Sequence, residues 1–276
     1  MTVMDLGALR FQASRVARRI VREWEGAQPL GWDDLQQELD LWQSRGRKAV
    51  FWWRDDDART EGAALDRLLE LSSRLRMPLA LAVIPVGAER SLERRLAGVD
   101  LVRVLQHGFD HSDHAPPGRP KSELSATRAP AEVQAQLEDG RRRLAALFGD
   151  RFLPVLVPPF NEMSHHLGAA VRHAGYMVVS VYGAFPGLPV ASRNSHLDII
   201  DWPTGQAAAP AVNVRRAIAA LKLRRYGIVP ASTPIGVVTH HLVHDAAIWS
   251  LAEELLGRLV RHPAVETPDI ARIFSA

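Results

Sequence analysis

Three consecutive aspartates, Asp55, Asp56 and Asp57, follow an aromatic, strand-like stretch in the segment FWWRDDDAR, residues 51–59. Like charges at this spacing repel one another, and none of the three carboxylates can be buried at low cost without a counter-charge. A divalent cation would supply that charge. The triplet therefore marks a candidate metal site, although an acidic cluster by itself is also typical of a solvated turn.

Histidines gather in two further segments, HGFDHSDH and HHLVHD. They are His107, His111 and His114 in the first, and His240, His241 and His244 in the second. Two imidazoles and one carboxylate form an open site for Zn²⁺ or a similar ion, with a coordination position left for water. A second carboxylate can take a proton from that water, and a histidine on the opposite side can protonate a leaving group.

The elements that would position these residues are seven short apolar or aromatic runs. They cover residues 49–53, 79–85, 101–106, 153–159, 176–183, 197–200 and 235–239. Apolar runs without alternation are typical of parallel strands covered on both faces, and their alternation with helical patterns predicts a barrel or a doubly wound sheet. Ligands of both architectures bind beyond the carboxyl ends of the strands, where the aspartates and histidines follow.

Amphipathic helices are predicted between these runs, over residues 133–147 and 248–259. Gly149 is expected to end the first, and Thr267 is expected to be the N-cap of a closing helix. Apolar residues between Leu9 and Trp24 recur at helical spacing among arginines, which favours a helix docked on the domain over a membrane-surface or targeting helix. We expect residues 1–45 to form a helical extension packed on a single barrel domain of residues 46–276, with a functional loop at 111–130.

Composition excludes several classes of function. The chain has 276 residues and no cysteine, which removes disulfides, thiolate metal sites and cysteine nucleophiles. The net charge is only +3, without an extended basic tract, so no nucleic-acid partner is expected. No apolar run is long enough to span a bilayer, so no transmembrane segment is expected. The N-terminus lacks the apolar stretch of a secretory signal, which predicts a cytoplasmic protein.

The order of these motifs, from about residue 48 to 245, resembles the NodB-type polysaccharide deacetylases, carbohydrate esterase family 4. The resemblance implies a distorted (β/α)7 barrel, similar to a TIM barrel, with an Asp-His-His metal site. The first family motif ends in a catalytic base followed by a metal ligand, which implies Asp55 as base and Asp56 as ligand. The alternative is a shift by one residue, to Asp56 and Asp57. The second motif implies His107 and His111 as metal ligands, with His114 a less favoured substitute.

The remaining motifs imply the residues around the substrate. The third resembles VPPFN, residues 157–161, whose backbone near Phe160 and Asn161 would hold the oxyanion. The fourth resembles Asp198, Asp201 and Trp202, with the tryptophan walling the groove. The last resembles VVTHH, residues 237–241. It implies Val238 or Val237 in the acetyl pocket and His240 as the acid, with His241 as the alternative.

Two departures from the family pattern stand out. The third-motif arginine, which in relatives pairs with the catalytic aspartate, is missing, because Val157 and Pro158 occupy that region. Arg54 or Arg193 is a candidate to supply the missing charge. The third aspartate of the triplet also replaces the small residue that usually follows the acidic pair.

The resemblance implies a metal-dependent hydrolase that removes an acetyl group, N-acetyl favoured, from a sugar-containing substrate. The metal expected is Zn²⁺, with Co²⁺, Mn²⁺ or Ni²⁺ as alternatives. The expected partner is an acetylated sugar, a glycan, or a nucleotide- or lipid-linked sugar. Two alternatives stay open: a non-catalytic carbohydrate-binding relative, and a glycosyltransferase with Mn²⁺ or Mg²⁺ on a nucleotide-sugar diphosphate. The second leaves the histidines without a role, since phosphate-bound cations of that kind prefer oxygen ligands.

Overall fold

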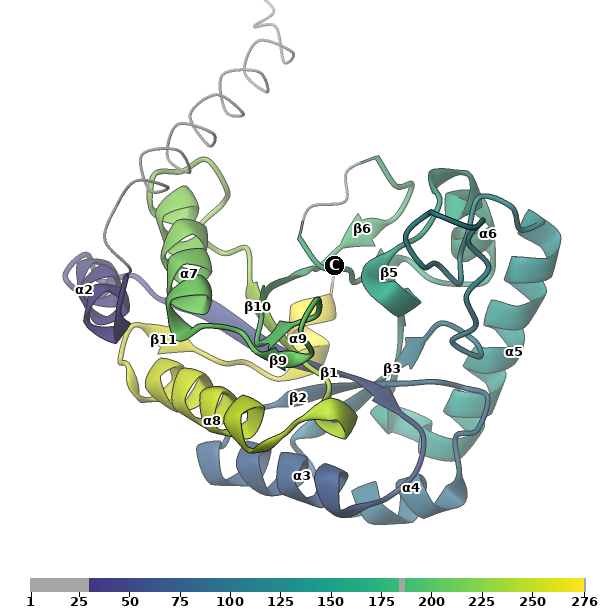
Figure 1. The fold of residues 1–276 in the computed structure, drawn as a ribbon, viewed down its shortest axis with the longest axis horizontal. Coiled ribbons are helices and arrows are strands. Elements are labelled where there is room, and N and C mark those ends of the chain that lie inside the picture. The colour runs from purple at the N-terminus through teal and green to yellow at the C-terminus, as the bar shows by residue number, and fades with distance from the viewer. Residues whose placement is uncertain (1–29, 184–186, 276) are drawn as a thin grey trace, which may run out of the picture.

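The computed structural model describes residues 30–183 and 187–275, and these form a curled parallel sheet with helices around it (Figure 1). The strand order is β6-β5-β4-β3-β2-β1-β10-β7, with β11 beside the start of β1. The strands are β1 (Ala49–Ala58), β2 (Leu79–Val83), β3 (Val102–His107), β4 (Phe152–Val157), β5 (Val178–Val179), β6 (Ala191–Ser192), β7 (Ser195–Asp198), β10 (Ile235–Thr239) and β11 (Val265–Glu266). A separate antiparallel pair is formed by β8 (Ile200–Asp201) and β9 (Gln206–Ala207).

The two ends of the sheet approach each other through the segment that carries β6 and β7. Strand β5 pairs with β6, and just beyond β5 the residue Tyr182 forms a parallel bridge to Ser195 at the start of β7. The sheet therefore curls into a half-barrel rather than remaining open. This confirms the distorted barrel predicted from the sequence.

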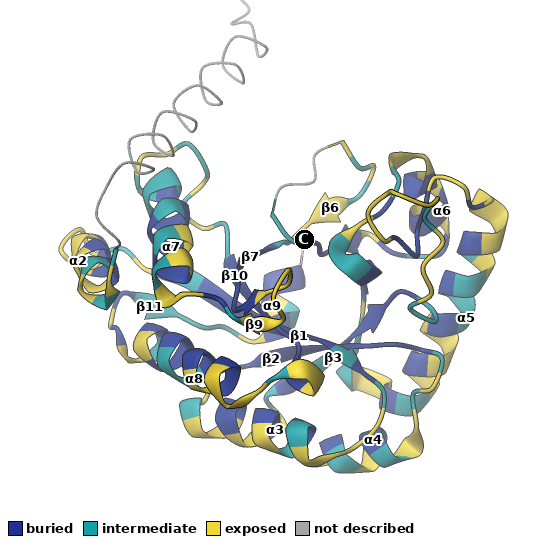
Figure 2. Cartoon of the chain, in the orientation of Figure 1, coloured by how far each residue is buried: buried dark blue, intermediate teal, exposed yellow. Residues whose placement is uncertain are grey.

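Helices cover the outer face of the sheet. They are α2 (Trp32–Gln43), α3 (Ala63–Leu75), α4 (Arg90–Leu96), α5 (Pro130–Phe148), α6 (Gly168–His173), α7 (Pro210–Arg225) and α8 (Ala246–Arg261). The largest apolar core lies between α2, α3, α4, α7, α8 and the outer side chains of the central strands, and the helices turn their buried residues toward it (Figure 2). The last helix, α9 (Ile270–Phe274), packs on the opposite face, where the ring of Phe274 meets the ring of Trp52 at 5.1 Å.

Most predicted elements are present, with two differences at their ends. Strand β1 continues through all three aspartates, and α9 takes its N-cap from Asp269, whose carboxylate accepts the N–H of Ala271. The prediction of Thr267 as N-cap was therefore wrong. The predicted stop at Gly149 is confirmed, because α5 ends at Phe148 and Gly149 follows with a positive φ of 51°, which glycine adopts without strain.

The predicted N-terminal helix between Leu9 and Trp24 lies outside the described residues. In the described part of the same segment, α2 packs Leu35, Leu39 and Trp42 into the main core. Among the helices described, none has the length and apolar character needed to cross a membrane.

Candidate active site

The side chains of the three aspartates of strand β1 point in three different directions. Arg54 and Asp56 are two residues apart and so share one face of the strand, whereas Asp55 points to the other face. The pairing of β1 with β2 is then interrupted by a bulge between Asp55 and Ala58, and Asp57 has a left-handed φ of 76°. Such a bulge re-aims the side chain that it carries. The triplet is therefore not one acidic cluster.

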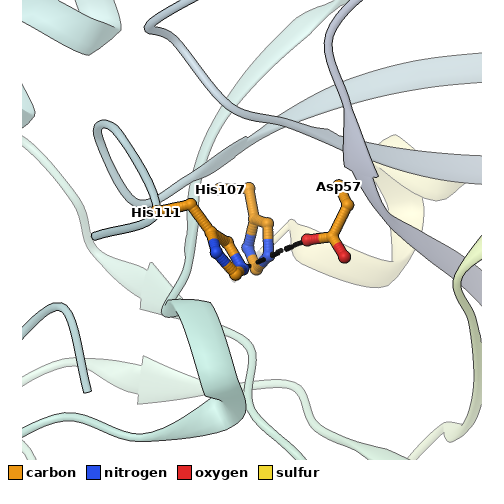
Figure 3. Close-up of side chains that lie close together, drawn as sticks. All are labelled: Asp57, His107 and His111. Atoms are coloured by element: carbon orange, nitrogen blue, oxygen red, sulfur yellow. Dashed lines mark hydrogen bonds and ion pairs between the residues drawn. The ribbon is translucent and has the colours of Figure 1, made fainter. Parts of the chain in front are cut away.

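Asp57 meets the two histidines of the second predicted motif. His107, the last residue of β3, and His111, in the loop after it, place Nε2 atoms 3.0 Å and 3.2 Å from Oδ1 of Asp57 (Figure 3). Among the described residues, one ligand atom from each of these three side chains lies within 4.8 Å of the other two. This is the donor set of an open divalent-metal site.

The surroundings of His107 fit a metal. Its Nδ1 lies 2.9 Å from the carbonyl oxygen of Val157 and donates to it, which leaves the lone pair of Nε2 directed at Asp57. Two acceptors facing each other require a cation between them. Burial lowers the pKa of His107, but hydrogen bonding to Asp57 and the charges of Asp56 and Asp57 raise it above its usual value. A proton and a metal ion thus compete for the same position.

The loop that carries His111 is held by Glu123, which the sequence-based prediction missed. The two carboxylate oxygens of Glu123 accept the N–H groups of Phe109 and His111, each at 2.7 Å. His111 itself has a φ of 66°, and a Cβ on Gly108 would lie 2.5 Å from Glu123 Oε2. Burial raises the pKa of Glu123 against the effect of the two N–H donors. The available signal was a carboxylate in the irregular loop directly after the histidine pair.

Asp56 pairs with Arg54 instead of joining the cluster. Arg54 is fully buried, and its Nε and Nη2 lie 2.9 Å and 3.0 Å from the two carboxylate oxygens of Asp56. Nη2 also donates to Oδ1 of Asn161 at 2.8 Å, and Nη1 donates to the hydroxyl of Ser180 at 2.7 Å. The assignment of Asp56 as the metal ligand is corrected by this geometry: the carboxylate that reaches both histidines is that of Asp57.

Asp55 lies on the outer face of β1, away from the histidine pair. Its carboxylate accepts from Nδ1 and from the backbone N–H of His241, and from the hydroxyl of Thr239. Burial raises the pKa of Asp55, but the charge and hydrogen bonds of His241 outweigh it and lower that pKa. The same pairing raises the pKa of His241 against burial. Neither residue lines the cavity that contains Asp57. The cavity is lined instead by Asp56, the base of the alternative register, and by His240, the favoured acid.

That cavity has a volume of about 540 Å³ and is lined by Asp56, Asp57, His107, His111, Phe160, Tyr182, Trp202, Arg216 and His240, with five further residues. His240 places Nε2 3.8 Å from Oδ2 of Asp56. The ring of Trp202 contacts that of His240 edge-on at 4.7 Å, and its Nε1 donates to Asp198 at 2.8 Å. Trp202 is 51% exposed, so one side of the ring is open to a ligand.

Only some of the other predicted site residues line this cavity. Asn161 and Asp201 line the cavity, but the N–H of Asn161 is engaged with the carbonyl oxygen of Pro158 at 3.1 Å. Val238 is fully buried and does not line the cavity. His114 is exposed and lies outside the metal cluster.

Comparison with known proteins identifies the fold and not a close relative. No family model matches the sequence, and no curated protein matches it. Among solved structures, a candidate polysaccharide deacetylase from Mycobacterium smegmatis superposes with a TM-score of 0.60 at 16% identity, over 90% of this chain and 92% of that one. A family 4 acetyl xylan esterase from Clostridium thermocellum, in complex with cobalt, gives 0.53 at 13% identity over 82% and 90%.

A third similar structure is a variant of a family 4 pseudoenzyme with restored activity. Its TM-score is 0.52 at 14% identity, over 83% of this chain and 68% of that one. The fold of this chain is therefore that of the family 4 carbohydrate esterases and polysaccharide deacetylases, as the sequence motifs indicated. Because the same fold occurs in a pseudoenzyme, function has to be argued from the site.

Proposed function

We propose that the protein is a metal-dependent hydrolase that removes an acetyl group, N-acetyl favoured, from a sugar-containing substrate. The observation that carries the proposal is the cavity in which Asp57, His107 and His111 converge beside a separate carboxylate, Asp56, and a separate imidazole, His240. Ligand set, base and acid are the parts that metal-assisted acyl hydrolysis requires. The family likeness of the fold supports the same reaction class.

Asp57, His107 and His111 would hold the metal ion. Two imidazoles and one carboxylate favour Zn²⁺, and Co²⁺, Mn²⁺ or Ni²⁺ can use the same donors. When bound, such an ion supplies Lewis-acid polarisation of the acetyl carbonyl and lowers the pKa of water. The surrounding protein orients these ligands. The carbonyl of Val157 accepts from His107 Nδ1 and fixes its ring, and Glu123 accepts the backbone N–H of His111 and holds its loop.

Asp56 is the proposed base, which takes the proton of the attacking water. Arg54 holds its carboxylate with two nitrogens and keeps it oriented toward the cavity. Arg54 thereby replaces the arginine that the third motif lacks, from a position two residues before the base. His240 is the proposed acid that protonates the departing amine, because its imidazole borders the cavity within 3.8 Å of Asp56.

Phe160 and Trp202 are the proposed substrate walls. The ring of Phe160 lies 4.5 Å from that of His111, and Trp202 stands on the other side against His240. Phe160 has a left-handed φ of 59°, and its N–H is the proposed oxyanion donor because that of Asn161 is already bonded. Asn161 instead acts through its side chain, which fixes Arg54.

Metal analysis of the purified protein, coupled to an acetate-release screen, tests the proposal. The screen covers N-acetylated and O-acetylated sugars, oligosaccharides and nucleotide sugars. We expect about one Zn²⁺ per chain, and acetate release that stops after chelation and returns with metal. The variant D57A is expected to lose both metal and activity, and H114A to keep both. Stoichiometric metal without acetate release from any substrate would contradict the proposal.

A non-catalytic carbohydrate-binding function is the second candidate, because a pseudoenzyme shares the fold. The third-motif position Val157 also lacks the arginine of active relatives. Against it stands Arg54, which already neutralises Asp56 in the buried wall of the cavity. Binding of acetylated oligosaccharide that D57A leaves unchanged, together with no turnover by the wild type, would favour this second function.

A further inference from the structure

A second cavity adjoins the proposed active site. It has a volume of about 570 Å³ and is lined mainly by residues of α7 and of the segment that connects β6 to β7. Tyr182 and Arg216 line both cavities and so form the wall between them. His196 in the second cavity and Asp198 in the first are two residues apart on β7, which separates the two walls by roughly 7 Å.

The lining of this second cavity is cationic. It contains Arg193, Arg216 and Arg224, together with His196, and includes no aspartate or glutamate. Within the described residues, none of the three arginines forms an ion pair with a carboxylate: their hydrogen bonds go to backbone carbonyl oxygens, and Arg224 also approaches His196. Three guanidinium groups without a counter-ion at one cavity create a local positive potential that favours an anion.

Arg224 shows that this charge is built into the fold. It is only 3% exposed, and its Nε and Nη1 donate to the carbonyls of Thr233 and Ala220 at 2.7 Å and 2.9 Å. Burial lowers the pKa of Arg224 to about 10, which reflects a cation without a charged partner. A buried guanidinium held by neutral groups is costly unless an anion completes its environment.

His196 adds a second donor at the same place. Its Nδ1 accepts the backbone N–H of Gly236 at 3.1 Å, so the neutral ring carries its proton on Nε2. Burial and the charge of Arg224 lower the pKa of His196 to about 4, so the ring is neutral at physiological pH. Nε2–H then faces Nη2 of Arg224 at 3.5 Å, and both atoms are donors. An oxyanion that lies to one side of this pair can accept from both.

We propose that this second cavity binds an anionic substituent of the substrate, a phosphate ester or a carboxylate, carried on or next to the acetylated sugar. Arginine forks recognise both groups by paired, charge-assisted hydrogen bonds. Because Tyr182 and Arg216 line both cavities, a sugar bound in the first can place a substituent beside Arg216. The inference rests on the proposed function only in taking the substrate to be an acetylated sugar. The anion site itself is argued from the residues of the second cavity alone.

The test measures binding without turnover. Glucose 1-phosphate, glucuronic acid and methyl glucoside, none of which carries an acetyl group, are titrated into the metal-loaded protein by calorimetry. We expect one of the two anions to bind and methyl glucoside to bind at least tenfold more weakly. R216Q and R193Q are each expected to lower the affinity for the anion about tenfold, because each loses one charged hydrogen bond. Binding of glucose 1-phosphate would identify the anion as a phosphate ester, and binding of glucuronic acid would identify it as a carboxylate.

Two control variants show whether anion binding depends on this cavity. R90Q removes an exposed arginine on α4, a helix that contributes no residue to the second cavity and lies far from α7 and β6 in Figure 1. The variant is expected to bind the anion as the wild type does. H107A disables the metal cluster and is also expected to retain the anion, because the second cavity does not use it. Equal binding by R216Q, R193Q and R90Q, no anion binding at all, or loss of binding in H107A would overturn the inference. Anion binding without acetate release would contradict the proposed function alone.

Discussion

Replacing Asp55 and Asp56 one at a time by asparagine separates the two possible registers of the acidic motif. Both side chains are fully buried, and both variants keep the shape of the residue. The proposed base is Asp56, and general-base catalysis contributes about 10²–10⁴-fold to a rate. D56N is therefore expected to lower kcat by about 10³-fold while it keeps bound metal, because the cluster of Asp57, His107 and His111 remains intact.

D55N is expected to act on stability instead. It breaks the buried pair with His241 and leaves that imidazole without its counter-charge, a change that costs about 3–5 kcal/mol. For a chain of this size, each kcal/mol shifts Tm by about 2–4 °C, so Tm is expected to fall by about 6–20 °C. The kcat of the folded fraction is expected to stay within about threefold of the wild type, since Asp55 does not line the cavity.

The assay is acetate release with metal-loaded protein, normalised to the folded fraction measured by circular dichroism at the assay temperature. H114A serves as the matched control, because His114 is an exposed residue of the same rim. A D55N variant that folds, binds metal and loses turnover as completely as D56N would refute the shifted register. So would a D56N variant with undiminished kcat.

Four further outcomes are expected. R54M leaves the buried carboxylate of Asp56 without its counter-charge, so the free energy of unfolding is expected to fall by about 3–5 kcal/mol in urea titrations. The double variant R54M/D56N is expected to recover part of that stability but no activity. E123Q weakens metal binding by about 10–100-fold, measured by competition with a chelating dye, because the loop of the second histidine loses its charged acceptor. The stability that wild type has over D55N is expected to be greatest between about pH 4 and 6.5. The Asp55 contribution is complete above its usual pKa of 3.8 and is lost as pH falls through its lowered folded-state pKa. The His241 contribution is complete below its usual pKa of 6.5 and is lost as pH rises through its raised folded-state pKa. Chelation lowers the stability of the wild type by about 3 kcal/mol when free metal had stood at 100 times Kd, and leaves D57A unchanged in a thermal melt.

The sequence allowed the barrel and the rim of the site to be predicted, because both depend on local signals. Apolar runs without alternation predicted the positions of the strands. Because ligands bind beyond the carboxyl ends of such strands, His107 could be predicted to lie near the acidic triplet. The register of the triplet could not be predicted in the same way. Alternation alone fits either Asp55–Asp56 or Asp56–Asp57 as base and ligand, and the register proposed here rests on a bulge in the pairing of β1 with β2.

The role proposed for Arg54 follows more directly from the sequence. Residues two apart on a strand share a face, so an arginine two positions before an aspartate is placed to pair with it once the strand is known to continue. What the sequence did not reveal is that β1 runs through the triplet to Ala58. Three adjacent carboxylates argue against a strand, and each is compensated by a cationic partner, Asp56 by Arg54 on the same strand, Asp55 by His241 and Asp57 by His107.

The position of Arg54 also explains how the third-motif strand end can lack its arginine. The third motif falls at the end of β4, which β3 and β2 separate from β1, whereas Arg54 and the proposed base Asp56 lie on one strand. The end of β4 can therefore serve the metal cluster, since the carbonyl of Val157 orients His107 and the turn after it presents Phe160 and Asn161. An arginine at position 157 would place a long cationic side chain where Val157 now packs in an apolar cluster. We expect V157R to be destabilised rather than activated, because Val157 is fully buried in an apolar cluster where a guanidinium would lose its hydration.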